Sequence, residues 1–315
     1  MWFKNLVVYR LPAGWSMSAA ELEAALAGAR LRPCGPLEMQ TRGWVEAAPD
    51  GRLVYALAGH LLVALGTEQK LLPASIVRQV AKERAVEIAA EQGHPVGRRQ
   101  MRDIKLRVLD ELRARALTRR RVTRAWIDVA GGRCVVEAAG AARAEQVVEA
   151  LHAVIDGFAV QPLKGDRSPQ TTLAGWLRHG DLPPRFSIEP DLELKAPDKV
   201  KGSIRYNRHP FDPRQVQSLL AGGLRVTRLG LTWRDRVTFA VTELLEFKRV
   251  ELLDIGSDSD GTADRGDEGG DAADEAARFD ADFMLMTGEL AGLLAEVDTA
   301  MGSVATTGAS ARQAA

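Results

Sequence analysis

The stretch LTRRRVTRAWIDVAGGRCVVEA, residues 117–138, joins a dense run of positive charge to a predicted β-hairpin. Four arginines fall within six residues of it: Arg119, Arg120, Arg121 and Arg124. The segments AWIDV and RCVVEAA follow, one on each side of the turn AGG, which is typical of two antiparallel strands. We expect the hairpin to enter a sheet and the arginine run to lie in a loop before it. Because like charges this close repel one another, the run favours water or a bound anion.

A helical pair is predicted immediately before this stretch. Residues 74–92 have apolar residues at helical spacing, and GHPVG interrupts the pattern before a second helix at about 98–116. One face of the second helix is basic and the neighbouring face is apolar. The basic residues are Arg98, Arg102, Lys105 and Arg113, and the apolar residues are Met101, Ile104, Val108 and Leu112. We expect the apolar face to pack and the basic face to contact phosphate.

Segments rich in β-formers on both sides of this pair predict an α+β fold. Prolines interrupt the chain after residue 166, so a separate domain of short strands is expected there. The Gly- and Asp-rich residues 256–277 are predicted to be a disordered loop, because they bury too little apolar surface to offset their ordering entropy. The predicted domains are a central sheet domain at 1–72 and 125–165, a helical tip at 73–124, a β-rich base domain at 166–300 and a frayed tail at 301–315.

The formal net charge of zero hides a separation of charge along the chain. Residues 251–282 hold twelve acidic and two basic side chains, a net of −10, so the other residues carry +10. A basic body of this kind favours phosphate polyanions, which release counterions when they are neutralised. No apolar run approaches the ~18 to 20 residues of a membrane span, and the first residues lack the pattern of a signal peptide, so a cytoplasmic location is expected.

A second basic stretch, KVKGSIRYNRHPFDPR, also favours phosphate. Its candidate contacts are Lys199, Lys201, Arg205, Arg208 and His209. Tyr206 and Phe211 lie among them, and such aromatics either stack on bases or pack in a core. Neither basic stretch has the spacing of a helix-turn-helix or zinc finger, so binding to the DNA backbone is favoured over base-specific recognition.

Signals of catalysis are few. The chain has no GxxxxGK[ST] loop, no HExxH and no GxSxG, and its two cysteines, Cys34 and Cys134, have no metal-ligand spacing. No cofactor is therefore expected. The alternative in the enzyme class is a Mg²⁺-dependent nuclease that uses Asp280, Asp282 and Glu289 with Asp128. Asp280 and Asp282 also suit the start of the last helix, whose dipole favours negative charge.

Six segments spread from residue 1 to about 300 carry a family resemblance: MWFKNLVVYRL, PCGPLEMQTRGWV (33–45), KLLPASIVRQ (70–79), AWIDV, TLAGWLRHG and RFDADFMLMTGELAGLL (278–294). They resemble the RdgC family of bacterial recombination-associated proteins. The resemblance implies an α+β protein without catalytic activity, a homodimer closed into a ring by tip-to-tip and base-to-base contacts. It also implies that a basic inner surface binds duplex DNA with little sequence preference, and that the protein restrains the strand-exchange recombinase by occupying DNA. A nucleoid-associated location follows from the same resemblance.

The family's DNA-contacting segments would fall on Leu117–Arg121 and Arg205–His209 of this chain. Family members carry aromatics in the first segment, where this chain has Leu117 and Arg120, which favours phosphate contact over wedging between bases.

If two copies encircle DNA, the tip needs apolar residues left over from its own packing, and Ile76, Val77 and Val80 are the predicted interface. A third class of function stays open, a recombinase inhibitor that acts by direct protein contact.

Overall fold

The computed structural model describes residues 2–197, 202–253 and 272–302. Within these residues, twelve strands form one antiparallel sheet in the order β2-β4-β5-β6-β1-β12-β11-β10-β8-β9, with β3 paired to β4 and β7 paired to β1. The strands are β1 (Leu6–Arg10), β2 (Gln40–Val45), β3 (Val54–Leu57), β4 (His60–Lys70), β5 (Thr118–Asp128), β6 (Arg133–Glu137), β7 (Gln161–Pro162), β8 (Phe186–Lys195), β9 (Ser203–Asn207), β10 (Arg225–Trp233), β11 (Val237–Thr242) and β12 (Phe247–Leu252). The helices are α1 (Ala19–Ala27), α2 (Ala74–Gln92), α3 (Arg98–Arg115), α4 (Ala141–His152), α5 (Pro169–His179), α6 (Pro213–Ala221) and α7 (Ala272–Ala300).

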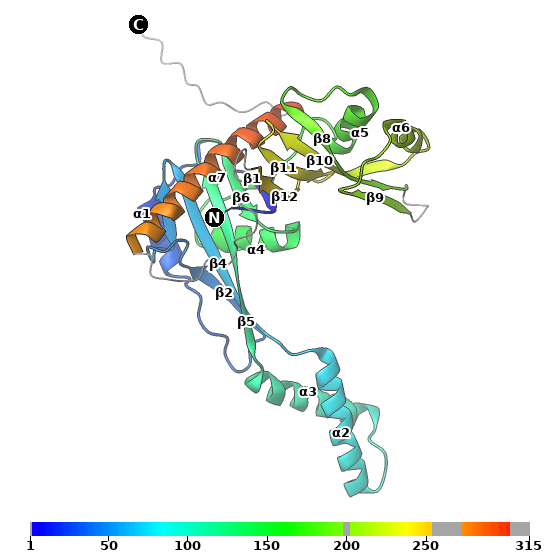
Figure 1. Ribbon diagram of the computed structural model, residues 1–315. Coiled ribbons are helices and arrows are strands. Elements are labelled where there is room, and N and C mark those ends of the chain that lie inside the picture. Colours follow the sequence, from blue (N-terminus) through cyan, green and yellow to red (C-terminus); the bar gives the residue numbers. More distant parts are fainter. Residues whose placement is uncertain (1, 198–201, 254–271, 303–315) are drawn as a thin grey trace.

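Both faces of the sheet are covered by helices. The long helix α7 crosses one face from the α1 end toward β8 (Figure 1), and α5 and α6 join it in the same apolar core. Helices α1 and α4 pack on the opposite face of the central strands in a second core. Alternation along β5 shows the division, since Trp126 lies in the first core while Ala125 and Ile127 lie in the second. No helix in the described part of the chain is both long and apolar enough to cross a membrane.

The predicted helical pair is confirmed as α2 and α3. Figure 1 shows it projecting away from the sheet beyond the ends of β4 and β5. Ala81 and Ala85 of α2 pack against Ile104 and Val108 of α3 in a small core of their own. Gly93 ends α2 in the left-handed region, φ +74°, where glycine meets no steric penalty.

The arginine run is a strand, so its prediction as a loop is wrong. β5 begins at Thr118 and pairs with β4 in unbroken register, from Lys70 opposite Thr118 to His60 opposite Asp128. The pairing uses backbone groups, which side-chain repulsion does not block. Successive side chains also point to opposite faces, so neighbouring arginines are separated by the sheet itself.

The sheet does not stop where the base domain was expected to begin. β1 pairs with β6 along its length and with β12 at Leu6 and Phe247, which links the first 165 residues to the later strands. Strands are confirmed in the region after residue 166, where β10, β11 and β12 belong to the same sheet. The domain boundaries themselves stay predictions.

Two boundaries near the C-terminus need correction. Residues 272–277, expected to be disordered, form the first turns of α7. Met301, expected in a frayed tail, is 1% exposed and packs in the core shared with α7. The rest of the acidic stretch up to residue 271, and residues 303–315, lie outside the described residues.

Candidate nucleic-acid interface

We call the distal ends of β4 and β5, residues 67–70 and 118–121, the neck. They lead from the sheet to the helical pair, and β2 pairs with β4 there as far as Gln40 opposite Gln69. Arg119, Arg120 and Arg121 lie opposite Gln69, Glu68 and Thr67, and all three arginines are exposed. None of them makes a hydrogen bond or ion pair with another residue of the described part. Glu68, the one carboxylate directly opposite, instead accepts a hydrogen bond from the Cys34 amide at 2.9 Å. The neck therefore presents three positive charges that form no ion pair with the carboxylates of residues 2–197, 202–253 and 272–302.

Arg124 differs from its three neighbours because it lies closer to the core. It is half-buried, and its Nε is buried without a hydrogen-bond partner. Burial raises the pKa of Glu137, while the nearby charges of Arg124 and Lys4 act in the opposite direction. The positive charge of Arg124 thus favours the ionised form of Glu137.

The basic face of α3 is present for three of its four predicted residues. Arg98, Arg102 and Lys105 are exposed, and none has a partner within the described ranges. Arg113 instead donates to the Leu37 carbonyl at 3.0 Å and lies 3.4 Å from Asp110. Arg113 therefore joins the C-terminal end of α3 to the loop at Leu37, and its side chain is 18% exposed.

The loop of residues 32–38, called the brace below, is joined to the neck by hydrogen bonds. No pattern in the sequence predicted these contacts. Lys70, 5% exposed, donates to the carbonyls of Gly35 at 2.7 Å and Pro36 at 2.9 Å. Within the loop, the hydrogen bond from Arg32 lowers the pKa of Glu38 to about 2. Leu117 lies just before β5, where its carbonyl accepts from the Leu71 amide at 2.8 Å, and its side chain is 79% exposed.

The loop reaches the sheet because two glycines face each other across β2 and β4. The chain at Arg30 and Leu31 crosses directly over Gly43, where a Cβ would lie 2.4 Å from the Leu31 nitrogen. At Gly66, its register partner, a Cβ would lie 2.7 Å from the ends of the Leu31 and Val45 side chains, which can shift. A side chain at Gly43 would therefore push the backbone at Leu31 away from β2.

The second basic stretch is positioned by β9, and its charges are largely paired. Arg205 lies 3.2 Å from Glu193, and Arg208 lies 3.5 Å from Glu251. His209 is exposed, with Nδ1 at 2.8 Å from the Pro210 carbonyl oxygen. Lys199 and Lys201 lie outside the described residues.

The rings of Tyr206 and Phe211 contact each other at a tilt of 58°, with centroids 5.5 Å apart, and pack against the main core. Of the two roles left open for them, the structure favours packing.

A charged network on the base strands escaped prediction. Asp191, 8% exposed, contacts both Arg228, at 2.9 Å, and Arg249. Arg228 also lies 3.9 Å from Glu193, so the two carboxylates and their arginines form one network. No sequence signal could have assembled it, because the residues come from three different strands.

The predicted tip interface is only partly available. Ile76 is 44% exposed, but Val77 and Val80 are half-buried and pack in the core between α2 and α3. The expectation that all three are left over from the packing of the pair is therefore wrong for the two valines. The interface itself stays a prediction, now centred on Ile76.

The carboxylates of the nuclease alternative are engaged separately. Asp280 accepts a hydrogen bond from the Tyr55 hydroxyl, Glu289 pairs with Arg236 at 2.9 Å, and Asp128 accepts from the Gly131 amide beside Arg133. In the described ranges, no group of three or more His, Cys, Asp or Glu side chains could hold a metal ion. The proposed ligand set is thus not assembled.

The two cysteines are free thiols. Cys134 is fully buried, and burial raises its pKa to about 12, which keeps it a protonated, apolar core residue.

Comparison with known proteins gives one consistent result. The family model described as "Putative exonuclease, RdgC" matches residues 1–304. A protein of Cupriavidus pinatubonensis named recombination-associated protein RdgC is 43% identical over 303 residues, covering 96% of this chain and 98% of the relative. Proteins of the same name from Janthinobacterium sp. (strain Marseille) and Bordetella pertussis are 43% and 41% identical over the same shares of both chains. These matches confirm the resemblance noted in the sequence, and the chain belongs to the RdgC family of recombination-associated proteins.

Proposed function

We propose that this protein binds double-stranded DNA without sequence preference, and that it does so as a homodimer that encircles the duplex. The names of the relatives indicate a role in recombination. In the proposed mechanism the protein modulates homologous recombination by limiting the access of the strand-exchange recombinase to DNA.

The observation that carries the proposal is the set of unpaired neck arginines. Arg119, Arg120 and Arg121 are exposed on a strand whose register is fixed by β4. Their planar guanidinium groups suit phosphate oxygens, which accept two parallel hydrogen bonds. Because phosphates are the same in every base sequence, such contacts give affinity without sequence preference.

The stripe of Arg98, Arg102 and Lys105 extends the same charge along α3. A duplex that contacts both the neck and α3 would meet more positive charges than a duplex that contacts only one of them. Leu117 lies just before β5, and Ile76 lies in the first turn of α2. Both side chains are exposed, so a second copy or the DNA could cover them.

The binding proposal is tested with duplexes of equal length and scrambled sequence, at several salt concentrations. We expect closely similar affinities and a steep, linear fall of log K with log salt. A sequence preference above about a hundredfold would contradict the proposal, because it reaches the range of specific binding.

Encirclement is tested separately, by the lifetime of complexes with closed-circular and linear DNA of the same length. A ring is expected to leave circular DNA more slowly, since it cannot slide off an end. Sedimentation of the free protein gives the oligomeric state. A monomer, or equal lifetimes on the two DNAs, would contradict the ring.

A further inference from the structure

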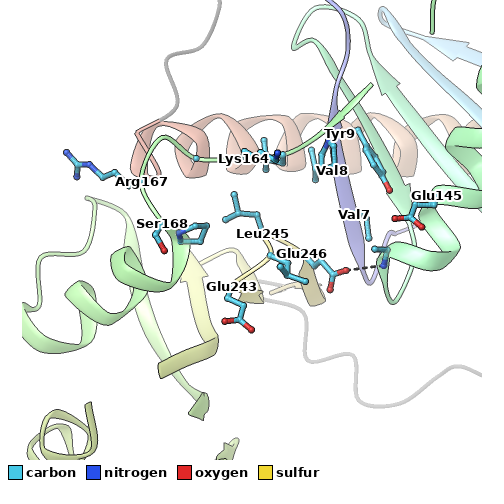
Figure 2. Close-up of a pocket in the computed structure, with 16 residues that line it drawn as sticks. Val7, Val8, Tyr9, Glu145, Lys164, Arg167, Ser168, Glu243, Leu245 and Glu246 are labelled. Atoms are coloured by element: carbon cyan, nitrogen blue, oxygen red, sulfur yellow. Dashed lines mark hydrogen bonds between the residues drawn. The ribbon is translucent and has the colours of Figure 1, made fainter. Parts of the chain in front are cut away.

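A cavity of about 390 Å³ opens where β1 separates from the strands beside it. β1 pairs with β12 at Leu6 and with β7 from Tyr9 onward, and the strands diverge between these points. Four segments line the opening: β1, the first turns of α4, residues 162–169, and the turn between β11 and β12 (Figure 2). None of the residues that line the cavity is among those assigned to DNA binding above.

The floor of the cavity is apolar. Val7, Val8, Leu163 and Leu245 contribute to it, and Figure 2 shows Leu245 between the other side chains. Leu245 is 3% exposed and lies at φ +56°, a conformation that costs free energy for a branched side chain. The turn holds it there, because the Leu245 amide donates to the Thr242 carbonyl at 3.0 Å.

One end of the cavity is polar and open to solvent, and Glu145 at this end is an exposed residue. Tyr9 is 4% exposed, and its hydroxyl has no hydrogen-bond partner in the described part of the chain. Figure 2 shows this hydroxyl pointing toward Glu145 of α4, whose carboxylate also lacks a partner among the described residues. Burial, reinforced by the charge of Glu145, raises the pKa of Tyr9 to about 12, so the phenol is neutral at pH 7 and can donate or accept.

Of the other charged groups around the cavity, Lys164 also lines it and makes an interaction of its own. Glu246 already accepts from the Ala141 amide at 3.1 Å, and its carboxylate lies 2.7 Å from Lys248 Nζ. Glu243 accepts from Gln170 at 3.0 Å. Arg167 points away from the cavity in Figure 2. Glu145, beside Tyr9, is therefore the carboxylate open to a ligand.

We propose that this cavity binds an aliphatic amine. Its ammonium group lies between the Glu145 carboxylate and the Tyr9 hydroxyl, and its methylene groups lie against Leu163 and Leu245. An ammonium group supplies donors to both oxygens, and an aliphatic chain is the partner that the apolar floor accepts. The amine belongs either to a free small molecule or to a lysine side chain, which have the same chemistry.

The test measures binding of pentylamine, pentanol and pentanoate to the full-length protein by calorimetry at pH 7. Pentylamine is expected to bind about tenfold more tightly than pentanol, because it adds a charge-assisted hydrogen bond, and pentanoate is expected to bind most weakly. Lysine blocked at both ends is the fourth probe. Its binding assigns the site to a lysine side chain, whereas binding of pentylamine alone assigns it to a free amine, and both results support the proposal.

Two substitutions locate the site. Glu145→Gln is expected to reduce pentylamine binding to the level of pentanol, and Tyr9→Phe to weaken it about threefold while preserving the ring that packs in the core. Glu149→Gln is the matched control, one turn along α4, where Glu149 lies 3.7 Å from Arg42 and does not line the cavity. Equal binding of pentylamine and pentanoate, or an unchanged affinity in Glu145→Gln, would overturn the proposal. Since these measurements contain no DNA, they are independent of the proposed DNA binding.

Discussion

Arg119, Arg120 and Arg121 of the neck extend into solvent without a carboxylate partner in the described residues, whereas the arginines on the base strands meet carboxylates at almost every position. Arg205 faces Glu193, Arg208 faces Glu251, and Arg228 shares Asp191 with Arg249. The two regions have similar basic sequences. Among the described residues, the arginines of the neck have no carboxylate partner, whereas Arg205 and Arg208 each have one.

The difference follows from the strands that each region pairs with. β5 lies between β4 and β6, and opposite the three arginines β4 has one carboxylate, Glu68, whose oxygen is already occupied by the brace. β9 and β10 instead flank β8, which carries Glu189, Asp191 and Glu193 at alternate positions on one face. The charge of a basic run on a strand is therefore free for a ligand only where the neighbouring strands bring no carboxylate to it.

The largest effect is expected from the neck. Replacing Arg119, Arg120 and Arg121 together by glutamine should lower the slope of log K against log salt by about 2 to 3 units and weaken DNA binding about a hundredfold or more at 0.1 M salt. The matched control is Arg205→Gln with Arg208→Gln, which should lower the slope by less than about 1 unit, since both charges are already paired. Fluorescence anisotropy with a short duplex measures both. An equal loss in the two variants would remove the distinction between the regions.

The next prediction concerns the free energy of unfolding, for which the larger effect is expected in the base strands and the smaller one in the neck. Asp191→Asn removes the charge that Arg228 and Arg249 share, and is expected to lower the free energy of unfolding by about 2 kcal/mol. This is less than the ~3 to 5 kcal/mol of a fully buried pair, because Arg249 keeps contact with water.

The triple neck variant should change the free energy of unfolding by no more than about 0.5 kcal/mol, because its side chains touch little. Urea unfolding of the two variants provides the comparison. A neck variant as unstable as Asp191→Asn would show that the arginines support the fold.

Local patterns predicted the helical pair because its signals are local. Ile104 and Val108 recur at helical spacing, and Gly93 terminates the first helix, so each helix could be read from its own residues. The hairpin of β5 and β6 followed from the same kind of evidence.

The candidate site could not be predicted in the same way, because availability of charge depends on partners distant in sequence. The partner of Arg208 is Glu251, and the brace that holds Lys70 comes from residues 35 and 36. The run at 118–121 was misassigned as a loop for the same reason. Its strand conformation depends on pairing with β4, fifty residues away in the sequence, and arginine itself has no strong preference for strands.

The smallest effect tests whether the base arginines can be released. Glu251→Gln removes the carboxylate 3.5 Å from Arg208, so the guanidinium is free to contact phosphate and one repulsive charge is lost. DNA affinity is expected to rise about two- to fivefold at low salt, and the gain should shrink as salt screens both terms. Glu46→Gln removes one negative charge from the exposed end of β2 and controls for net charge, since its partner Arg30 is already 4.0 Å away. If the gain comes from Arg208, adding Arg208→Gln must abolish it in the Glu251→Gln protein. A gain of equal size in Glu46→Gln would mean that only the total charge of the protein matters, and a gain that persists in the double variant would mean that it does not come from Arg208.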